Sequence, residues 1–374
     1  MLLVLCEPQW VLIGIHVTHV NRVTTSLNPM DRNSTPQKPP EYTTSAPVIA
    51  IIGTGGTISC TTDSNGDLTP SLSIADIAEQ AGVTDMPTCE ISCFDAMSLD
   101  SSALQLEDID ALISEVVTCA ETTRAQGKQL AGVVVVHGTD TMEETAMAMD
   151  VALGASIPVA LTGAQRPADH PHADGPGNLK DAVAHLLEAA QSSADSPAER
   201  RPHIVFGGRV LPAAGTTKTH TTADAGFSYE AAESLASFLN TEPTLTRFSG
   251  WNVPILDAYA GADGQLVRAM MGATRRGEIP SIDAMVVAGL GSGNIPPLMA
   301  DALFEAISDT GMPVVVCSRV LEGGVHFVYG GSGGGANLAR HGMMSGGNLR
   351  PSQARIGLIG YLARTAANEN SVED

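Results

Sequence analysis

Two glycine-rich loops of this sequence carry a threonine shortly after an apolar run. Residues 48–52 (VIAII) lead into Gly-Thr-Gly-Gly-Thr57, and residues 133–136 (VVVV) lead into His-Gly-Thr139-Asp140. Runs of β-branched residues are typical of strands buried in a parallel sheet, and ligands bind at the carboxyl ends of such strands. A threonine hydroxyl attacks a carbonyl carbon when a neighbouring group accepts its proton. The two loops therefore predict a nucleophilic site at one edge of a sheet.

A base for this chemistry is predicted at Lys218. A carboxylate alone is a poor base for a hydroxyl, whereas a lysine is a better one when burial disfavours its charged form. Lys218 lies within the polar run TTKTHTT, residues 216–222, and not on a charged face. Taken alone, the threonines could equally shape turns or cap helices, and Lys218 could be an ordinary surface lysine.

Three competing motifs are weaker. A dinucleotide fingerprint in the first loop would need glycine where Ile58 stands, and no G-K-[ST] follows. The segment HPHAD, residues 170–174, has the spacing of a dinuclear zinc site, but a glycine follows in place of the further histidine. Residues 330–334 fit G-x-S-x-G, a pattern that a run of small residues matches easily. We therefore expect neither a metal nor a cofactor.

Strands and helices are expected to alternate through most of the chain, which predicts an α/β fold. The helix after the second loop should start at a capping box, Thr141-x-x-Glu144. A hairpin should join residues 204–206 to residues 210–211. The other expected strands are residues 48–52, 90–94, 133–136, 157–161, 284–288 and 313–317 and a segment near Ile255, and the expected helices are residues 73–81, 109–117, 142–153, 179–187, 266–274 and 297–307 and one that opens at Pro351.

Two domains are predicted, because 374 residues can bury two substantial cores. Residues 1–46 read as a disordered lead-in, within which Met30 could be the true start. Residues 47–238 would form a larger N-terminal domain with a mostly parallel sheet and helices on both faces. Periodicity fades over a linker at residues 239–253, and residues 254–374 would form a smaller α/β domain.

Composition excludes several classes of partner. The formal net charge of −21 argues against nucleic acid and against an anionic membrane surface. No apolar run approaches the roughly 18 residues of a membrane helix. The six cysteines form no C-x-x-C pair, so we expect them to be reduced and mostly buried. Residues 1–22 lack the basic leader of a secretory signal, which favours a cytoplasmic location.

Two segments resemble the signatures of bacterial L-asparaginases, the asparaginase/glutaminase family. They are IIGTGGTIS at residues 51–59 and GVVVVHGTDTM at residues 132–142. The resemblance spans about residue 47 to the C-terminus, and its further matches follow in the family's order: ADGP at 173–176, NL at 178–179, TKT at 217–219, GLGSGN at 289–294 and PSQAR at 351–355. It implies the two-domain α/β fold, an amidohydrolase activity on L-asparagine and no cofactor.

The resemblance also implies residue roles. Thr57 would be the nucleophile that forms an acyl-enzyme. Thr139 and Lys218 would position the water that hydrolyses this ester. Asp140 would hold the α-ammonium of the substrate and Ser98 its α-carboxylate, and Gly56 would also contact the substrate. Asparagine would thus be converted to aspartate and ammonia, with weaker activity on glutamine.

The resemblance further implies an oligomer, a dimer or a dimer of dimers (a homotetramer). Asn294 matches an asparagine that reaches into the site of the neighbouring subunit. Two positions depart from the family's pattern, because residues 61–70 contain no tyrosine, with Leu68 about where one is expected, and Leu99 stands where glutamine is frequent. The Leu-Asp-Ser-Ser run that starts at Leu99 is closer to intracellular or actinobacterial members. No residue matches the glutamate that some members contribute from the second domain.

Two other functions stay open from the sequence. An amidase that feeds ammonia to a tRNA-dependent amidotransferase would carry a folded N-terminal extension, whereas residues 1–46 are short and read as disordered. A catalytically silent amino-acid-binding protein would keep the same pocket without turnover. Release of ammonia from asparagine separates the silent protein from the enzyme.

Overall fold

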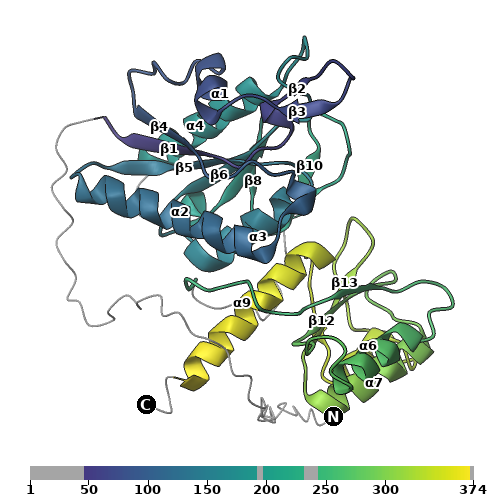
Figure 1. Cartoon of the computed structure of the whole chain (residues 1–374). Coiled ribbons are helices and arrows are strands. Elements are labelled where there is room, and N and C mark those ends of the chain that lie inside the picture. Colours follow the sequence, from purple (N-terminus) through teal and green to yellow (C-terminus); the bar gives the residue numbers. More distant parts are fainter. Residues whose placement is uncertain (1–45, 192–196, 231–242, 371–374) are drawn as a thin grey trace, which may run out of the picture.

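The computed structural model describes residues 46–191, 197–230 and 243–370. Figure 1 shows two α/β domains, one above the other, with a long helix between them. The predicted lead-in, apart from residue 46, and the first part of the predicted linker, residues 239–242, lie outside the described residues.

The upper domain is built on a six-stranded sheet with the order β4-β1-β5-β6-β7-β8. All neighbouring strands are parallel except β7 and β8, which form the antiparallel hairpin predicted from the sequence. Two short hairpins, β2–β3 and β9–β10, lie beside this sheet. The strands are β1 (Val48–Gly53), β2 (Cys60–Thr62), β3 (Leu68–Pro70), β4 (Glu90–Asp95), β5 (Leu130–Val136), β6 (Val159–Thr162), β7 (His203–Phe206), β8 (Arg209–Pro212), β9 (Thr216–Lys218) and β10 (Phe227–Tyr229).

Helices cover both faces of this sheet because alternate residues of its strands face opposite ways. Ala50 and Ile52 belong to the core on the side of α2 and α3. Ile49 and Ile51 belong to the core on the side of α1 and α4. The helical elements are α1 (Ile74–Gln80), α2 (Leu106–Ala125), α3 (Met142–Leu153), α4 (Gly175–Gln191), α5 (Pro197–Arg200), η1 (Thr57–Ser59) and η2 (Ser101–Ala103).

The lower domain has a parallel four-stranded sheet with the order β11-β12-β13-β14. Met285 and Val314 face the core that α6 and α7 cover, whereas Val286 and Val315 face helix α9. The elements are β11 (Ile255–Asp257), α6 (Gln265–Arg275), β12 (Met285–Gly289), α7 (Pro297–Thr310), β13 (Val314–Ser318), α8 (Gly335–Arg340), β14 (Met344–Ser345) and α9 (Pro351–Asn370).

Helix α9 joins the two domains. It lies between β12 and β13 of the lower domain and α3 of the upper one (Figure 1). Ile356 and Ile359 of α9 share one buried cluster with Met147 of α3 and with Val286 and Val315 of the lower sheet. The domains are therefore held together by a common apolar core, whose burial is the main favourable term in folding.

The predicted fold class is confirmed, whereas one predicted local motif is wrong. Thr141 precedes α3, but its side chain makes no capping hydrogen bond to the helix. Its hydroxyl instead donates to the Ser101 carbonyl oxygen at 2.8 Å. Glu144 lies 3.8 Å from Arg355 of α9 and completes no capping box. Thr141 and Glu144 therefore contact residues distant in the chain in place of the backbone at the start of α3.

A buried histidine pair should make the fold sensitive to acid. The rings of His185 and His203 meet edge to face, 4.8 Å apart. Burial, aided by the neighbouring His203, lowers the pKa of His185 to about 4, against a weaker opposing effect of Glu199. The unfolded chain, with a histidine pKa near ~6.5, thus binds more protons than the folded chain between these values, and stability falls as the pH falls from 7 towards 4. In His185→Gln the melting temperature should fall less between pH 7 and pH 5 than in wild type. An equal fall in both proteins would contradict this assignment.

Candidate active site

The two threonine loops leave the upper sheet side by side. Strands β1 and β5 are parallel neighbours, and their last residues, Gly53 and Val136, are paired. The first loop is fastened to the end of β5, because Thr54 donates both its backbone N–H and its hydroxyl to the Val136 carbonyl oxygen, each at 3.0 Å. The sequence prediction that the loops meet at one sheet edge is therefore confirmed.

Glycines let these loops touch. Gly56 has φ +83°, and a Cβ there would lie 2.7 Å from the Gly138 Cα. Only a residue without a side chain fits such a contact at that backbone angle. Thr57 follows at once as the first residue of η1, a turn that Ser59 closes by donating its N–H and its hydroxyl to the Gly56 carbonyl oxygen, at 3.0 and 2.8 Å. The predicted nucleophile thus lies on a rigid turn against the second loop.

This contact predicts a large effect of a single methyl group. Gly56→Ala combines a positive φ with a collision against Gly138, so we expect a loss of about 3 kcal/mol in the free energy of unfolding. Gly66 is the matched control, because it has φ +89° but an open space around its Cβ position. Gly66→Ala should cost about 1 kcal/mol, from backbone strain alone. Denaturant titration measures both values, and equal losses would contradict the close contact.

Lys218 ends strand β9 and reaches the second loop. Its Nζ donates to the Thr139 Oγ1 at 2.8 Å and to the Asp140 Oδ1 at 2.9 Å. The Lys218 side chain is 19% exposed, whereas Asp140 is 63% exposed. The structure therefore brings together three of the four predicted catalytic residues by direct hydrogen bonds, and the amine does not point into bulk water.

Ser101 supports this loop, a role that the sequence did not reveal. Its Oγ accepts from the Asp140 N–H at 3.2 Å. A Cβ at Gly138 would lie 2.5 Å from the same oxygen. Ser101 begins η2, some forty residues earlier in the chain. Its place in the Leu-Asp-Ser-Ser run was the only available signal.

His137 holds the second loop from within. It is fully buried, and burial lowers the pKa of its imidazole. Its Nδ1 lies 2.7 Å from the Gly138 carbonyl oxygen, which cannot donate, so Nδ1 carries the proton. Nε2 then accepts from the Thr145 hydroxyl at 3.1 Å. A neutral imidazole thus links the loop before Thr139 to helix α3.

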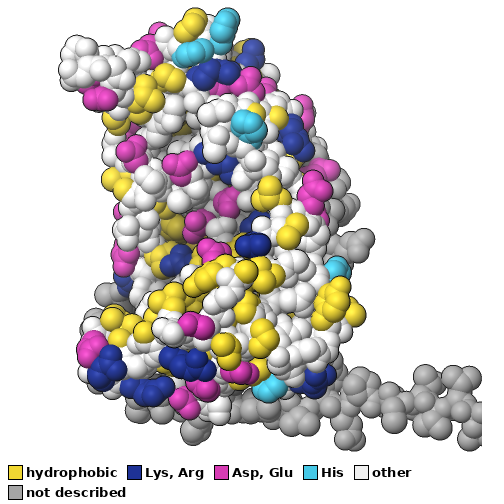
Figure 2. Space-filling view, turned by 90° about the vertical axis from the view of Figure 1, so that its right-hand side faces the viewer, with side chains coloured by type: hydrophobic (Ala, Val, Ile, Leu, Met, Phe, Trp, Pro, Cys, Tyr) yellow, Lys and Arg dark blue, Asp and Glu magenta, His cyan; other side chains and the backbone are white. Residues whose placement is uncertain are grey.

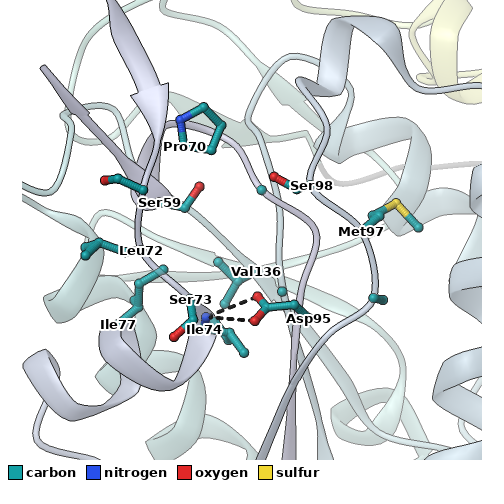
Figure 3. Close-up of a pocket in the computed structure, with 14 residues that line it drawn as sticks. Ser59, Pro70, Leu72, Ser73, Ile74, Ile77, Asp95, Met97, Ser98 and Val136 are labelled. Atoms are coloured by element: carbon teal, nitrogen blue, oxygen red, sulfur yellow. Dashed lines mark hydrogen bonds between the residues drawn. The ribbon is translucent and has the colours of Figure 1, made fainter. Parts of the chain in front are cut away.

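Ser98 lies beside Gly55 of the first loop. The Leu99 N–H donates to the Thr54 carbonyl oxygen at 3.0 Å, and a Cβ at Gly55 would lie 2.8 Å from the Leu99 backbone. Ser98 borders a cavity of about 330 Å³ together with residues of β1, η1 and α1. Figure 3 shows Ser98, Ser59 and Asp95 around it, with the Asp95 carboxylate accepting from the Ile74 N–H. The segment of Ser98 and Leu99 is therefore fixed to the backbone of the loop that carries Thr57.

Asn294 lies in the lower domain. It follows β12 and closes a turn with Leu290, through backbone hydrogen bonds of 2.8 and 2.9 Å. Within the described residues, no hydrogen bond joins its side chain to Thr57, Thr139 or Lys218. The structure therefore does not bring Asn294 to the other predicted site residues within one chain.

The rejected zinc motif has a structural use. Both carboxylate oxygens of Asp174 accept from backbone N–H groups, those of Gln165 and Arg166, at 2.9 Å each. His170 Nδ1 accepts from the His172 N–H at 3.0 Å. Residues 46–191, 197–230 and 243–370 contain no cluster of three His, Cys, Asp or Glu side chains that could hold a metal. These side chains shape the loop between β6 and α4.

The cysteines of the described segments are free thiols. Cys60, Cys89 and Cys317 are buried, and Cys93 and Cys119 are half-buried. Burial raises the pKa of Cys317 to about 12 and that of Cys119 to about 11, so both stay protonated at neutral pH. The prediction of reduced cysteines is confirmed for these five. No helix among the described residues is long and apolar enough to cross a membrane.

Comparison with known proteins defines the class to which this fold and site belong. Residues 48–248 match the family model of the asparaginase N-terminal domain, and residues 252–373 match that of the glutaminase/asparaginase C-terminal domain. The protein is therefore an amidohydrolase. It belongs to the asparaginase family, as the two signature segments of the sequence predicted.

Individual relatives cover most of the chain. It is 35% identical to a "Probable L-asparaginase" of Deinococcus radiodurans, over 87% of this chain and 96% of that protein. It is 31% identical to "L-asparaginase 2" of Escherichia coli, over 67% and 71% of the two chains. A crystal structure described as a probable cytoplasmic L-asparaginase from Campylobacter jejuni superposes with a TM-score of 0.65, at 27% identity, over 86% of this chain and 96% of that one.

Proposed function

We propose that this protein hydrolyses the side-chain amide of L-asparagine to L-aspartate and ammonia through an acyl-enzyme on Thr57. One observation carries the proposal: Lys218 Nζ contacts Thr139 and Asp140 in a loop that touches the loop of Thr57. Lys218, Thr139 and Asp140 thus meet beside the loop that carries Thr57, at the carboxyl end of a parallel sheet. Family membership supports asparagine as the substrate.

The first step forms the ester. Thr57 Oγ1 attacks the side-chain carbonyl carbon of asparagine, the C–N bond breaks, and the hydroxyl proton leaves with the departing ammonia. Backbone N–H groups of the glycine-rich loops are available to the oxygen that becomes negative. Gly56 permits this close approach because it has no side chain.

The second step releases aspartate. A water adds to the ester carbon, its proton passes to the Thr139–Lys218 pair, and the bond to Thr57 breaks with a proton returned to its oxygen. Lys218 Nζ and Thr139 Oγ1 lie 2.8 Å apart, so the proton taken from the water can be shared between them. The two residues therefore act as one unit in this step.

Substrate orientation follows from the remaining groups. The exposed Asp140 carboxylate would bind the α-ammonium, and Ser98, beside Gly55 of the first loop, would bind the α-carboxylate. Glutamine is longer by one methylene, a difference that changes transition-state binding by only about 1–3 kcal/mol. We therefore propose weaker glutaminase activity.

A homo-oligomer, a dimer or a dimer of dimers, would complete the pocket. Asn294 belongs to the lower domain, which presents exposed apolar side chains on the face shown in Figure 2. Among the exposed apolar residues of this domain are Tyr259, Leu266, Leu298, Val328 and Tyr329. Such surface is typical of subunit interfaces. Sedimentation analysis would give the mass, and a monomer at full specific activity would contradict the role of Asn294.

The solved relative from Campylobacter jejuni is described as cytoplasmic, which supports a cytoplasmic location for this protein.

The direct test follows products and intermediate together. Purified protein is incubated with L-asparagine, and aspartate and ammonia are measured, with an expected ratio of one to one. Added hydroxylamine should divert the acyl-enzyme and yield the β-hydroxamate of aspartate. Binding of asparagine without ammonia release would favour the silent amino-acid-binding protein, and turnover without any hydroxamate would argue against the ester.

A further inference from the structure

We propose that Glu143 is a positioning residue that fixes Lys218 and couples it to helix α9. The inference rests on the proposed function for the role of Lys218, whereas the contacts of Glu143 do not depend on that function. Glu143 lies in the first turn of α3, three residues after Asp140. Its carboxylate receives hydrogen bonds from the hairpin that carries Lys218 and from the first turn of α9.

One carboxylate oxygen holds the Lys218 backbone. Glu143 Oε2 accepts from the Lys218 N–H at 2.6 Å and from the Thr217 hydroxyl at 2.6 Å. The same lysine reaches Thr139 with its Nζ at 2.8 Å. Lys218 is thus fixed at both ends to one segment, by its amine to the loop before α3 and by its backbone to the first turn of that helix. Hydrogen bonds to an ionised carboxylate are about twice as strong as neutral ones.

The other oxygen connects to the lower domain. Glu143 Oε1 accepts from the Ser352 hydroxyl at 2.5 Å. The next residue, Gln353, is 1% exposed and donates to the carbonyl oxygens of Glu143 and Thr216, at 3.2 and 2.9 Å. It also accepts from the Gly215 N–H at 2.9 Å. The start of α9 therefore holds the residues directly before Lys218.

The position of the Lys218 amine consequently depends on packing between the domains. Helix α9 is buried against the lower sheet and α3, so its first turn has little freedom. Replacing Glu143 by glutamine keeps the size but removes the negative charge that strengthens the hydrogen bonds from Lys218 and Thr217. Because a shift of ~1 Å in a positioned group can cost ~100-fold in rate, a small relaxation of β9 should be visible in kcat.

The kinetic test uses neighbouring variants. Glu143→Gln should lower kcat on asparagine by about 10- to 100-fold with KM nearly unchanged, because the lysine acts on the reaction and not on binding. Ser352→Ala removes only the hydrogen bond from α9 to the Glu143 carboxylate and should lower kcat by a smaller factor in the same direction. Glu144→Gln is the matched control: Glu144 is the adjacent acid on the same turn, but it faces Arg355, so kcat should stay within about twofold of wild type. Equal effects of Glu143→Gln and Glu144→Gln would overturn the proposal.

A second readout does not need turnover. The chain has four lysines, Lys38, Lys128, Lys180 and Lys218, so acetylation of each can be followed by mass spectrometry. In Glu143→Gln, Lys218 should acetylate several-fold faster than in wild type, while the exposed Lys180 and the half-buried Lys128 report any general loosening. Unchanged labelling of Lys218 in folded Glu143→Gln would refute the positioning role.

The two readouts separate the failure of this inference from the failure of the proposed function. If the wild-type protein shows no asparaginase activity but Lys218 is still labelled faster in Glu143→Gln, Glu143 remains a positioning residue and the proposed reaction is wrong. In the Lys218→Met background, Glu143→Gln should cause little further loss of kcat, because a residue that acts through Lys218 loses its effect with it. A full multiplicative loss there would show a purely structural role.

Discussion

Thr57→Ala should abolish asparagine turnover, with a loss of kcat on the order of 10⁴-fold or more. The variant lacks the oxygen that forms the ester, whereas the backbone turn that carries it, closed by Ser59 onto Gly56, is unchanged. Ammonia release and hydroxamate formation should disappear together, because both require the same acyl-enzyme. Asparagine should still bind, and calorimetry would measure that binding.

A neighbouring hydroxyl provides the control for this result. Ser59 lies two residues away and closes the turn with its hydroxyl, at 2.8 Å from the Gly56 carbonyl oxygen. Ser59→Ala should therefore cost about 1 kcal/mol of stability and leave most of the turnover. If Thr57→Ala retained wild-type kcat, the nucleophile would be another residue, and Thr139 would be the next to test.

Lys218→Met should lower kcat by about 10²- to 10⁴-fold, the range expected when a proton-transfer group is lost. Methionine keeps much of the side-chain length but removes the amine that contacts Thr139 and Asp140. The backbone of β9 keeps its bonds to Glu143, so the hairpin should stay in place. Initial rates of ammonia release over a range of asparagine concentrations would give kcat and KM separately.

The control for Lys218 is Lys128, whose amine pairs with Glu90 at 2.7 Å on the surface. Lys128→Met should leave both kinetic constants unchanged, since an exposed ion pair contributes only about 0–1 kcal/mol. A rise in KM alone in Lys218→Met would show that the amine holds substrate and takes no part in the reaction.

Local patterns were sufficient to predict the elements of this fold. The apolar runs before the two threonine loops became the neighbouring strands β1 and β5, and the stripe of apolar residues from Ile109 to Val117 became α2. Periodicity and turn residues are local signals, so they survive in a single sequence. The predicted capping box at Thr141 was wrong because a local signal does not include partners that are distant in the chain. Its local partners were present, but Ser101 and Arg355, distant in the chain, compete for the same groups.

The site was predictable only as far as its motifs extend along the chain. Thr57, Thr139 and Asp140 could be predicted as one site because strand ends place them on one edge. The resemblance to the asparaginase family implied Ser98 and Asn294, and no hydrogen bond within the described chain links Asn294 to the threonines. Residues that act through long-range hydrogen bonds, such as Glu143, carry no local signal. Their roles depend on partners more than 70 residues away.

The amino-acid sequence by itself determined which segments become strands and helices, the family, and which loops carry hydroxyl groups, because these properties follow from neighbouring side chains along the backbone. Only the tertiary structure decided that the amine of Lys218 meets Thr139 and that α9 meets Glu143, the residue that holds the backbone of Lys218. Those contacts join residues 79 and 209 positions apart. Whether such distant residues meet depends on how the sheets and helices pack on one another, and no local sequence pattern specifies that packing.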